Sequence, residues 1–177
     1  MFLWRILMDY IRTRHSVYML TYHMVFVTKW RKPVISDKIG DFMKDTARRL
    51  CLGYGGEVLA AETDRDHIHL LVSMPPTCDI SLIVRSLKTQ LSKEVHARED
   101  LNTEVQKYLY GDVPLWSPSY FVATTGSVSM ETVKSYIEEQ RTDEHKRKYI
   151  RKSEYWVGKG KSRSVKNKVE TSAVQKN

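Results

Sequence analysis

The stretch that most constrains this fold is residues 66–74, which read Asp-His-Ile-His-Leu-Leu-Val-Ser-Met. In an extended strand, alternate side chains point to the same face of a sheet. One face therefore carries His67 and His69. The other face carries an unbroken apolar row, made of Ile68, Leu70, Val72 and Met74. The pattern predicts a strand whose apolar face is covered by helices and whose opposite face presents two neighbouring imidazoles.

The pair of histidines leaves several uses open. The imidazole face is suited to a partner molecule, a metal ion or a second layer of sheet. Neutral histidines are frequent in half-buried sheets, so a His-x-His pair by itself is weak evidence of a metal site. Other motifs in the chain are needed to distinguish among these uses.

The length and the cysteines indicate one domain in a reducing compartment. A chain of 177 residues is long enough to bury a core without disulfides. Cys51 and Cys78 are far apart and fit no zinc spacing. Near the N-terminus, Arg5 and Asp9 interrupt the apolar runs, which predicts neither a signal peptide nor a membrane span. We therefore expect a cytoplasmic protein with no membrane partner.

The net charge of +8 is concentrated near the C-terminus. Residues 141–177 hold 12 Lys and Arg against 4 Asp and Glu, whereas residues 1–140 hold 17 of each kind. A neutral body with a basic extension favours an anionic polymer as partner, because clustered Lys and Arg bind phosphates. A solubilising tail with no partner remains an equally good interpretation.

Side-chain periodicity predicts a definite order of elements along the chain. Residues 1–16 form an N-terminal extension, where the spacing of Trp4, Leu7, Tyr10 and Ile11 allows a short amphipathic helix. The elements predicted next are a strand at 17–29, a helix at 36–53 capped by Ser36, a strand at 57–63, the histidine strand, a helix from Asp79 or Ser81, a loop with room for a short helix at 98–114, and a strand at 116–125.

The predicted order is strand, helix, strand, strand, helix, strand. This is the split βαβ pattern of the ferredoxin-like, RRM-like α+β fold, with two helices on one face of a four-stranded antiparallel sheet. The histidine strand is expected to be central. RNA-recognition modules of this topology bind single strands on the open face, so a single-stranded nucleic acid is a reasonable partner by analogy.

An additional helix is predicted after Gly126. Val133, Tyr136, Ile137 and Gln140 recur at i, i+3, i+4 and i+7, so they share one face of this helix. An ordinary docking stripe, in which the tyrosine packs and the glutamine lies at the edge, explains this pattern as well as a functional site does.

Three segments together resemble a known family. They are residues 22–33 (YHMVFVTKWRKP), residues 66–72 (DHIHLLV), and residues 116–126 followed by Tyr136 and Gln140. In this order and at these separations the sequence resembles the HUH single-tyrosine transposases of the smallest prokaryotic insertion sequences, the TnpA or IS200-like transposases. The match covers the chain from about Tyr18 to Gln140.

The resemblance implies the roles of four residues and the nature of the partners. It implies that His67, His69 and Gln140 bind a divalent metal ion, Mg2+ or Mn2+, and that Tyr136 is the nucleophile on a C-terminal catalytic helix. It also implies a homodimer whose composite active sites combine the histidines of one subunit with the tyrosine helix of the other. Imidazole ligands suit manganese better than magnesium.

The implied activity is cleavage and rejoining of single-stranded DNA at the hairpin-bearing ends of an insertion sequence, through a 5′-phosphotyrosine intermediate. The catalytic HUH domain is expected at 17–146, between the extension at 1–16 and a basic tail at 147–177, both of which depart from the family pattern. A domesticated repeat-associated tyrosine transposase and a non-catalytic single-strand-binding module are the alternatives. The residues predicted to contact the DNA backbone are Lys29, Arg31, Lys32, Arg85 and Lys88.

Overall fold

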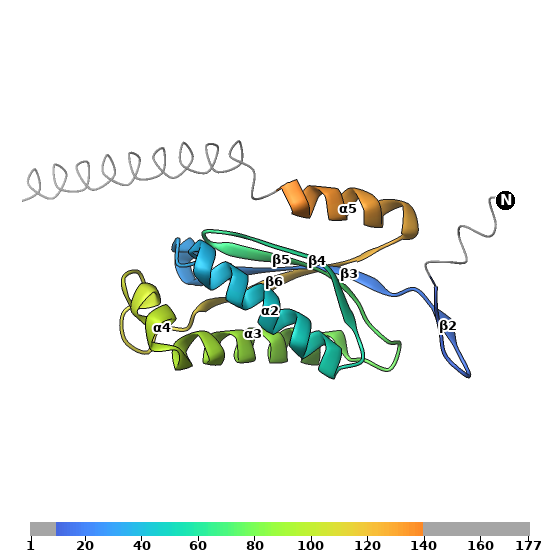
Figure 1. Cartoon of the computed structure of the whole chain (residues 1–177), viewed down its shortest axis with the longest axis horizontal. Coiled ribbons are helices and arrows are strands. Elements are labelled where there is room, and N and C mark those ends of the chain that lie inside the picture. Colours follow the sequence, from blue (N-terminus) through green and yellow to red (C-terminus); the bar gives the residue numbers. More distant parts are fainter. Residues whose placement is uncertain (1–9, 140–177) are drawn as a thin grey trace, which may run out of the picture. The chain divides into compact units, whose positions relative to one another are not determined.

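The computed structural model describes residues 10–139 of the chain. Within this range the order of strands and helices is the predicted one, with a small N-terminal hairpin added (Figure 1). The elements are β1 (Ile11–Arg12), β2 (Val17–Tyr18), β3 (Thr21–Thr28), the 3-10 turn η1 (Lys29–Arg31), α2 (Asp37–Gly53), β4 (Glu57–Asp64), β5 (His67–Ser73), α3 (Ile80–Ala97), α4 (Glu99–Gln106), β6 (Trp116–Thr125) and α5 (Ser127–Glu139).

The main sheet has four strands in the order β4-β5-β3-β6, and every neighbouring pair is antiparallel. The histidine strand β5 is therefore central, with β4 on one side and β3 on the other. In this register His69 lies opposite Val25 of β3 and Glu62 of β4. The predicted ferredoxin-like α+β fold is confirmed.

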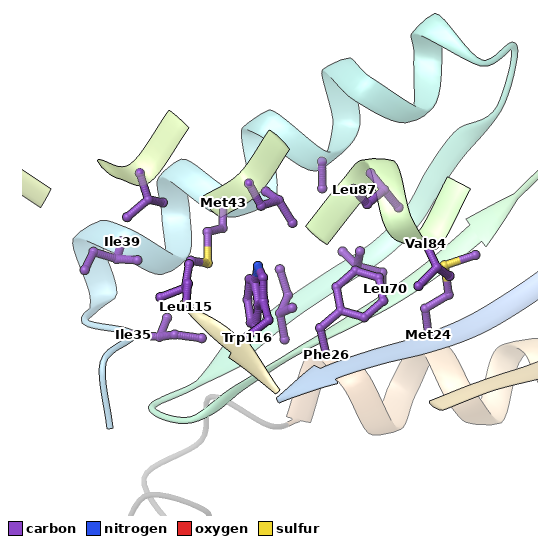
Figure 2. Packing of buried hydrophobic residues seen from close by; sticks show 14 of the residues in the cluster. Met24, Phe26, Ile35, Ile39, Met43, Leu70, Val84, Leu87, Leu115 and Trp116 are labelled. Atoms are coloured by element: carbon purple, nitrogen blue, oxygen red, sulfur yellow. The ribbon is translucent and has the colours of Figure 1, made fainter. Parts of the chain in front are cut away.

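Helices lie on both faces of the sheet, but they are distributed unequally. Helices α2 and α3 cover one face, and α5 lies over the other (Figure 1). The large core is between the sheet and α2 and α3, where Phe26 of β3 and Trp116 of β6 meet edge to face at 6.1 Å (Figure 2). Fully burying one large apolar side chain contributes about 1.5–3 kcal/mol, so this core supplies most of the stability.

The two faces of β5 divide as the alternation predicts. Ile68, Leu70, Val72 and Met74 belong to the large core under α2 and α3. Leu71 belongs to a separate small cluster with Ala60 of β4 and Ile137 of α5. Because the histidines alternate with the core residues, they lie on the α5 side of the sheet.

Side-chain caps fix where the first two long helices begin. Ser36 Oγ accepts a hydrogen bond from the backbone N–H of Ile39 at the start of α2. Asp79 Oδ1 accepts from the N–H groups of Ser81 and Leu82 at the start of α3. Asp79 is therefore the N-cap of α3, and Ser81 lies within the first turn.

The N-terminal part of the strand predicted at 17–29 differs from the prediction. Val17–Tyr18 pairs with Ile11–Arg12 in a separate two-stranded hairpin, and the central strand β3 begins only at Thr21. The hairpin is closed by a hydrogen bond from the N–H of Thr13 to the carbonyl of Ser16. The helix proposed around Tyr10 and Ile11 is therefore wrong at Ile11, because β-pairing takes up its backbone; Trp4 and Leu7 lie outside the described residues.

The segment at 98–114 contains the short helix for which the prediction left room. In α4, Leu101 and Val105 are buried in the large core, four residues apart on one helical face. No helix within residues 10–139 is long and apolar enough to span a membrane.

Candidate active site

Three histidines and one tyrosine gather on the α5 face of the sheet. The rings of His67 and His69 on β5 are 4.8 Å apart between centroids and nearly perpendicular. Tyr136 of α5 meets the His69 ring edge to face at 5.8 Å. The ring of His23 on β3 lies nearly parallel to that of His69, with 5.2 Å between the centroids and an interplanar angle of 16°. The structure thus brings the predicted nucleophile to the predicted metal ligands, while Gln140 lies just outside the described residues.

Sheet register explains why His23 joins the pair. His23 is opposite Leu71, and His69 is two residues along β5 on the same face. Diagonal neighbours in an antiparallel pair are within reach of ring side chains. No role for His23 was predicted from the sequence, although the alternation along residues 21–28 places it on one face of a strand. Only the register between β3 and β5 shows that it meets His69.

Helix α5 is held on the sheet by a few apolar contacts. Ile137 is fully buried against Ala60 and Leu71, and Val133 and Leu59 pack around them. Tyr136 adjoins Ile137 on the helix and keeps 48% of its surface exposed. The docking stripe and the tyrosine are therefore parts of one arrangement, in which the apolar residues anchor the helix and leave the phenol at the surface.

Hydrogen bonds occupy the same ring nitrogen in both β5 histidines. His67 Nδ1 is 2.5 Å from Asp66 Oδ1, and His69 Nδ1 is 3.0 Å from His23 Nε2. Asp66 is almost completely buried, and its Oδ2 accepts from Arg31 Nη1 at 3.2 Å. Burial lowers the pKa of His23, which favours its neutral ring.

The donor set fits a divalent metal ion. Metal-binding histidines commonly bond a carboxylate through the second ring nitrogen, as His67 does with Asp66. Asp64, Asp66 and His67 also form a group whose three ligand atoms lie within 4.8 Å of one another. Both oxygens of Asp66 already accept hydrogen bonds, from His67 and Arg31, so this carboxylate is better placed to orient a ligand than to act as one.

The five predicted DNA contacts fall into two groups. Lys29, Arg31 and Lys32 lie at the end of β3 beside Asp66, to whose carbonyl Thr28 donates a backbone hydrogen bond. Arg85 and Lys88 are on α3, in the helix layer on the other face of the sheet.

The ammonium of Lys88 is already occupied. It donates to the carbonyls of Ser117, Pro118 and Ser119, and burial lowers its pKa. Lys88 therefore links α3 to β6 through these hydrogen bonds.

Exposed aromatic side chains border the site and were not singled out from the sequence. Phe121 of β6 is 52% exposed and meets His23 edge to face at 5.7 Å. Trp30 is 64% exposed on the η1 turn, where Trp30 and Arg31 both have positive φ (55° and 53°). Such a backbone is costly for non-glycine residues and persists only where surrounding contacts hold it, here the Arg31 pair with Asp66.

Comparison with known proteins identifies the family. The sequence model of the family described as "Transposase IS200 like" matches residues 16–140. The chain is 31% identical to the ISDra2 transposase TnpA of Deinococcus radiodurans over 74% of its own length and 91% of that protein. It is 28% identical to the transposase for insertion sequence element IS200 of Salmonella typhimurium, over 71% of this chain and 80% of that one.

Solved structures agree with this assignment. A Deinococcus radiodurans R1 protein described as a transposase superposes with a TM-score of 0.58 at 30% identity, covering 73% of this chain and 97% of that one. A REP-associated tyrosine transposase bound to a REP hairpin has the same fold at 13% identity, with a TM-score of 0.50 over 73% of this chain and 70% of that one. The family match and the relatives define the chain as a DNA transposase, and its structure has a sheet face on which histidines and a tyrosine meet. The chain belongs to the IS200-like transposase family.

Proposed function

We propose that this protein cleaves and rejoins single-stranded DNA at the ends of an insertion sequence, with Tyr136 as the nucleophile and a divalent metal ion as cofactor. The observation that carries the proposal is the meeting of Tyr136 with His69 on the face that also holds His67. A partly exposed phenol beside two imidazoles that can bind a metal ion is an arrangement suited to phosphodiester transfer to a tyrosine.

His67, His69 and Gln140 are the proposed ligands of the ion. A bound Mg2+ or Mn2+ neutralises charge on the scissile phosphate and polarises its oxygens. The chain itself positions the ligands: β5 holds both imidazoles on one face, and Asp66 and His23 hydrogen-bond their Nδ1 atoms. Gln140 lies four residues after Tyr136 in the sequence, the spacing at which two residues of a helix share a face, although Gln140 itself is outside the described residues.

Tyr136 carries out the exchange of phosphodiester bonds. A phenol is mostly protonated at neutral pH and is a weak nucleophile until its proton is removed or its developing charge is stabilised. Its oxygen forms a bond to phosphorus while the bond to the 3′ oxygen breaks. The phenol loses a proton and the leaving oxygen gains one, so the products are a 5′-phosphotyrosine and a free 3′-hydroxyl. One phosphodiester replaces another, so a second 3′-hydroxyl reverses the step without ATP and joins the strands.

Single-stranded DNA fits the surroundings of the site. Phe121 and Trp30 offer exposed rings on which unpaired bases can stack. Lys29, Arg31 and Lys32 supply positive charge next to Trp30, where β3 ends. Arg85, on α3 in the helix layer, would reach only DNA that extends beyond this face. The basic segment at 147–177 is outside the described residues, and its Lys and Arg side chains are proposed as further phosphate contacts. A hairpin at the element end is the proposed recognition feature, in line with the REP hairpin bound by the structural neighbour.

The sharpest test of this function is a search for a covalent adduct. The full-length protein is incubated with Mn2+ and single-stranded element ends labelled on the 3′ side of the cleavage site. We expect a labelled protein band that resists denaturation and disappears when EDTA is present. Cleavage without a protein-linked strand would contradict the tyrosine mechanism.

We further propose that the working form is a homodimer in which α5 of each subunit docks on the sheet of its partner. In the described chain Tyr136 lies over its own His69, and only Gly126 links β6 to α5. The surface that receives α5 is identical in both subunits, so an exchange of helices replaces each contact by the same contact.

Mixing two inactive variants tests this exchange. Tyr136→Phe lacks the nucleophile and His67→Ala lacks a metal ligand, so each alone should be inactive. If helices exchange, a heterodimer holds one site with neither substitution and should have about half of the activity of an unsubstituted dimer. Random 1:1 mixing makes about half of the dimers heterodimers, so a co-expressed mixture should recover about a quarter of the activity. Inactive mixtures with heterodimers demonstrated by mass spectrometry would show that each Tyr136 serves the histidines of its own chain.

A further inference from the structure

We infer that His23 is a positioning residue that sets the ring tautomer of His69, so that His69 presents its Nε2 atom to the metal ion. The inference rests on the proposed function, because it takes His69 as a metal ligand. It concerns a residue on a different strand, outside the His-x-His motif.

A hydrogen bond joins the rings of His23 and His69. His69 Nδ1 and His23 Nε2 are 3.0 Å apart, so one nitrogen carries a proton and donates the hydrogen bond, and the other nitrogen accepts it. A histidine binds a metal through a nitrogen that has no proton, and the other ring nitrogen then carries one. If His69 binds through Nε2, its proton is on Nδ1 and is donated to His23 Nε2.

This assignment also defines the state of His23. Its Nε2 must be the acceptor, so its own proton is on Nδ1 and the ring is neutral. The ring is held in place by its hydrogen bond to His69, with the two ring planes 16° apart, and by the edge contact with Phe121. His23 is therefore fixed in position by two rings while it accepts from the first of them.

The neighbouring ligand shows the same arrangement with a different acceptor. His67 Nδ1 donates a hydrogen bond to Asp66, whose carboxylate accepts it, so Nε2 is the nitrogen of His67 that can serve as a ligand atom. Asp66 comes from the turn before β5, whereas His23 comes from β3. Two acceptors from different elements thus impose the same tautomer on both histidines of β5.

Two substitutions separate the hydrogen bond from the packing of the ring. His23→Phe keeps an aromatic ring against His69 and Phe121 but removes the acceptor. His23→Gln places an amide oxygen near the position of Nε2 and keeps the acceptor. The matched control is His96→Gln, a change on α3 in the helix layer.

The first measurement is the tautomer of His69 in the metal-free, full-length protein, read from long-range proton–nitrogen NMR spectra and assigned with a His69→Asn variant. We expect the Nδ1–H tautomer in the unsubstituted protein and in His23→Gln, and its loss in His23→Phe. An Nε2–H tautomer in the unsubstituted protein would overturn the inference whatever the variants do.

The second measurement is Mn2+ affinity by titration calorimetry or electron paramagnetic resonance. Loss of an outer partner of a metal ligand typically weakens binding about 10- to 100-fold, which we expect for His23→Phe. His23→Gln should remain within about fivefold of the unsubstituted protein. Equal Mn2+ affinity in His23→Phe and the unsubstituted protein would overturn the inference.

These readouts separate the inference from the proposed function. The tautomer and the Mn2+ affinity are measured without DNA. If they behave as expected but no covalent adduct forms, the transposase chemistry fails and the role of His23 stands. If the adduct forms normally in His23→Phe at low Mn2+ concentration, the chemistry stands and the role of His23 fails.

Discussion

Changing Tyr136 to phenylalanine will abolish the covalent protein–DNA adduct and reduce cleavage by about 10³-fold or more. The substitution removes only the phenol oxygen, which is the proposed nucleophile, and without it no bond to phosphorus can form. The ring that meets His69 at 5.8 Å remains, and the anchor Ile137 is untouched, so the fold and the docking of α5 should persist. Adduct formation and hairpin affinity are measured on the same preparations.

Tyr120→Phe is the matched control for this change. Tyr120 is exposed to nearly the same extent as Tyr136, but its ring lies beside Lys88 of α3, on the face of the sheet opposite α5. Its substitution should leave the adduct yield within about twofold of the unsubstituted protein. A Tyr136→Phe protein that still forms the adduct would show that another residue is the nucleophile.

Replacing His69 by alanine will remove metal-dependent cleavage while leaving hairpin binding largely intact. His69 is nearly buried at the centre of the site, where it meets His67, His23 and Tyr136. Its loss removes one proposed ligand and the ring against which the tyrosine rests. We expect cleavage to fall by about 10³-fold or more, as for other residues that act as one unit in a site.

His67→Ala should have the same effect, since both imidazoles are proposed to bind one ion. His96→Gln should cleave normally, because His96 is on α3, in the layer on the far side of the sheet. The comparison uses cleavage rates across a Mn2+ series together with thermal unfolding to verify that each variant folds. Normal cleavage by His69→Ala would remove the metal-site assignment.

Much of this protein followed from local patterns in the sequence. Alternation along residues 66–74 separated the core residues from the histidines, because the strand period is two whatever the strand pairs with. The spacing of Val133, Tyr136 and Ile137 predicted a helix with a docked face, and Ile137 is fully buried in the small cluster on the sheet. Ser36 predicted where one helix begins, and Asp79 was one of two candidates, with Ser81, for the start of the next, since a cap bonds only to its own first turn.

Contacts between distant segments could not be obtained in this way. The pairing of His23 with His69 depends on the register of β3 against β5, which no spacing within one strand contains. Lys88 was expected to contact the DNA backbone, yet its ammonium donates hydrogen bonds to three carbonyls of β6, a contact that the pattern within α3 does not contain. The strand expected at 17–29 divides because Val17–Tyr18 pairs with Ile11–Arg12 instead of the main sheet.

The sequence by itself therefore determined which residues of the histidine strand face the core, most of the helices and strands, and which family the chain resembles. Those properties depend on side chains a few positions apart, and local periodicity encodes them. The tertiary structure decided which side chains meet in the site: His23 on His69, Asp66 between His67 and Arg31, and Tyr136 over His69. Strand register and the docking of α5 create these contacts, and both arise only when the whole sheet has assembled around its core.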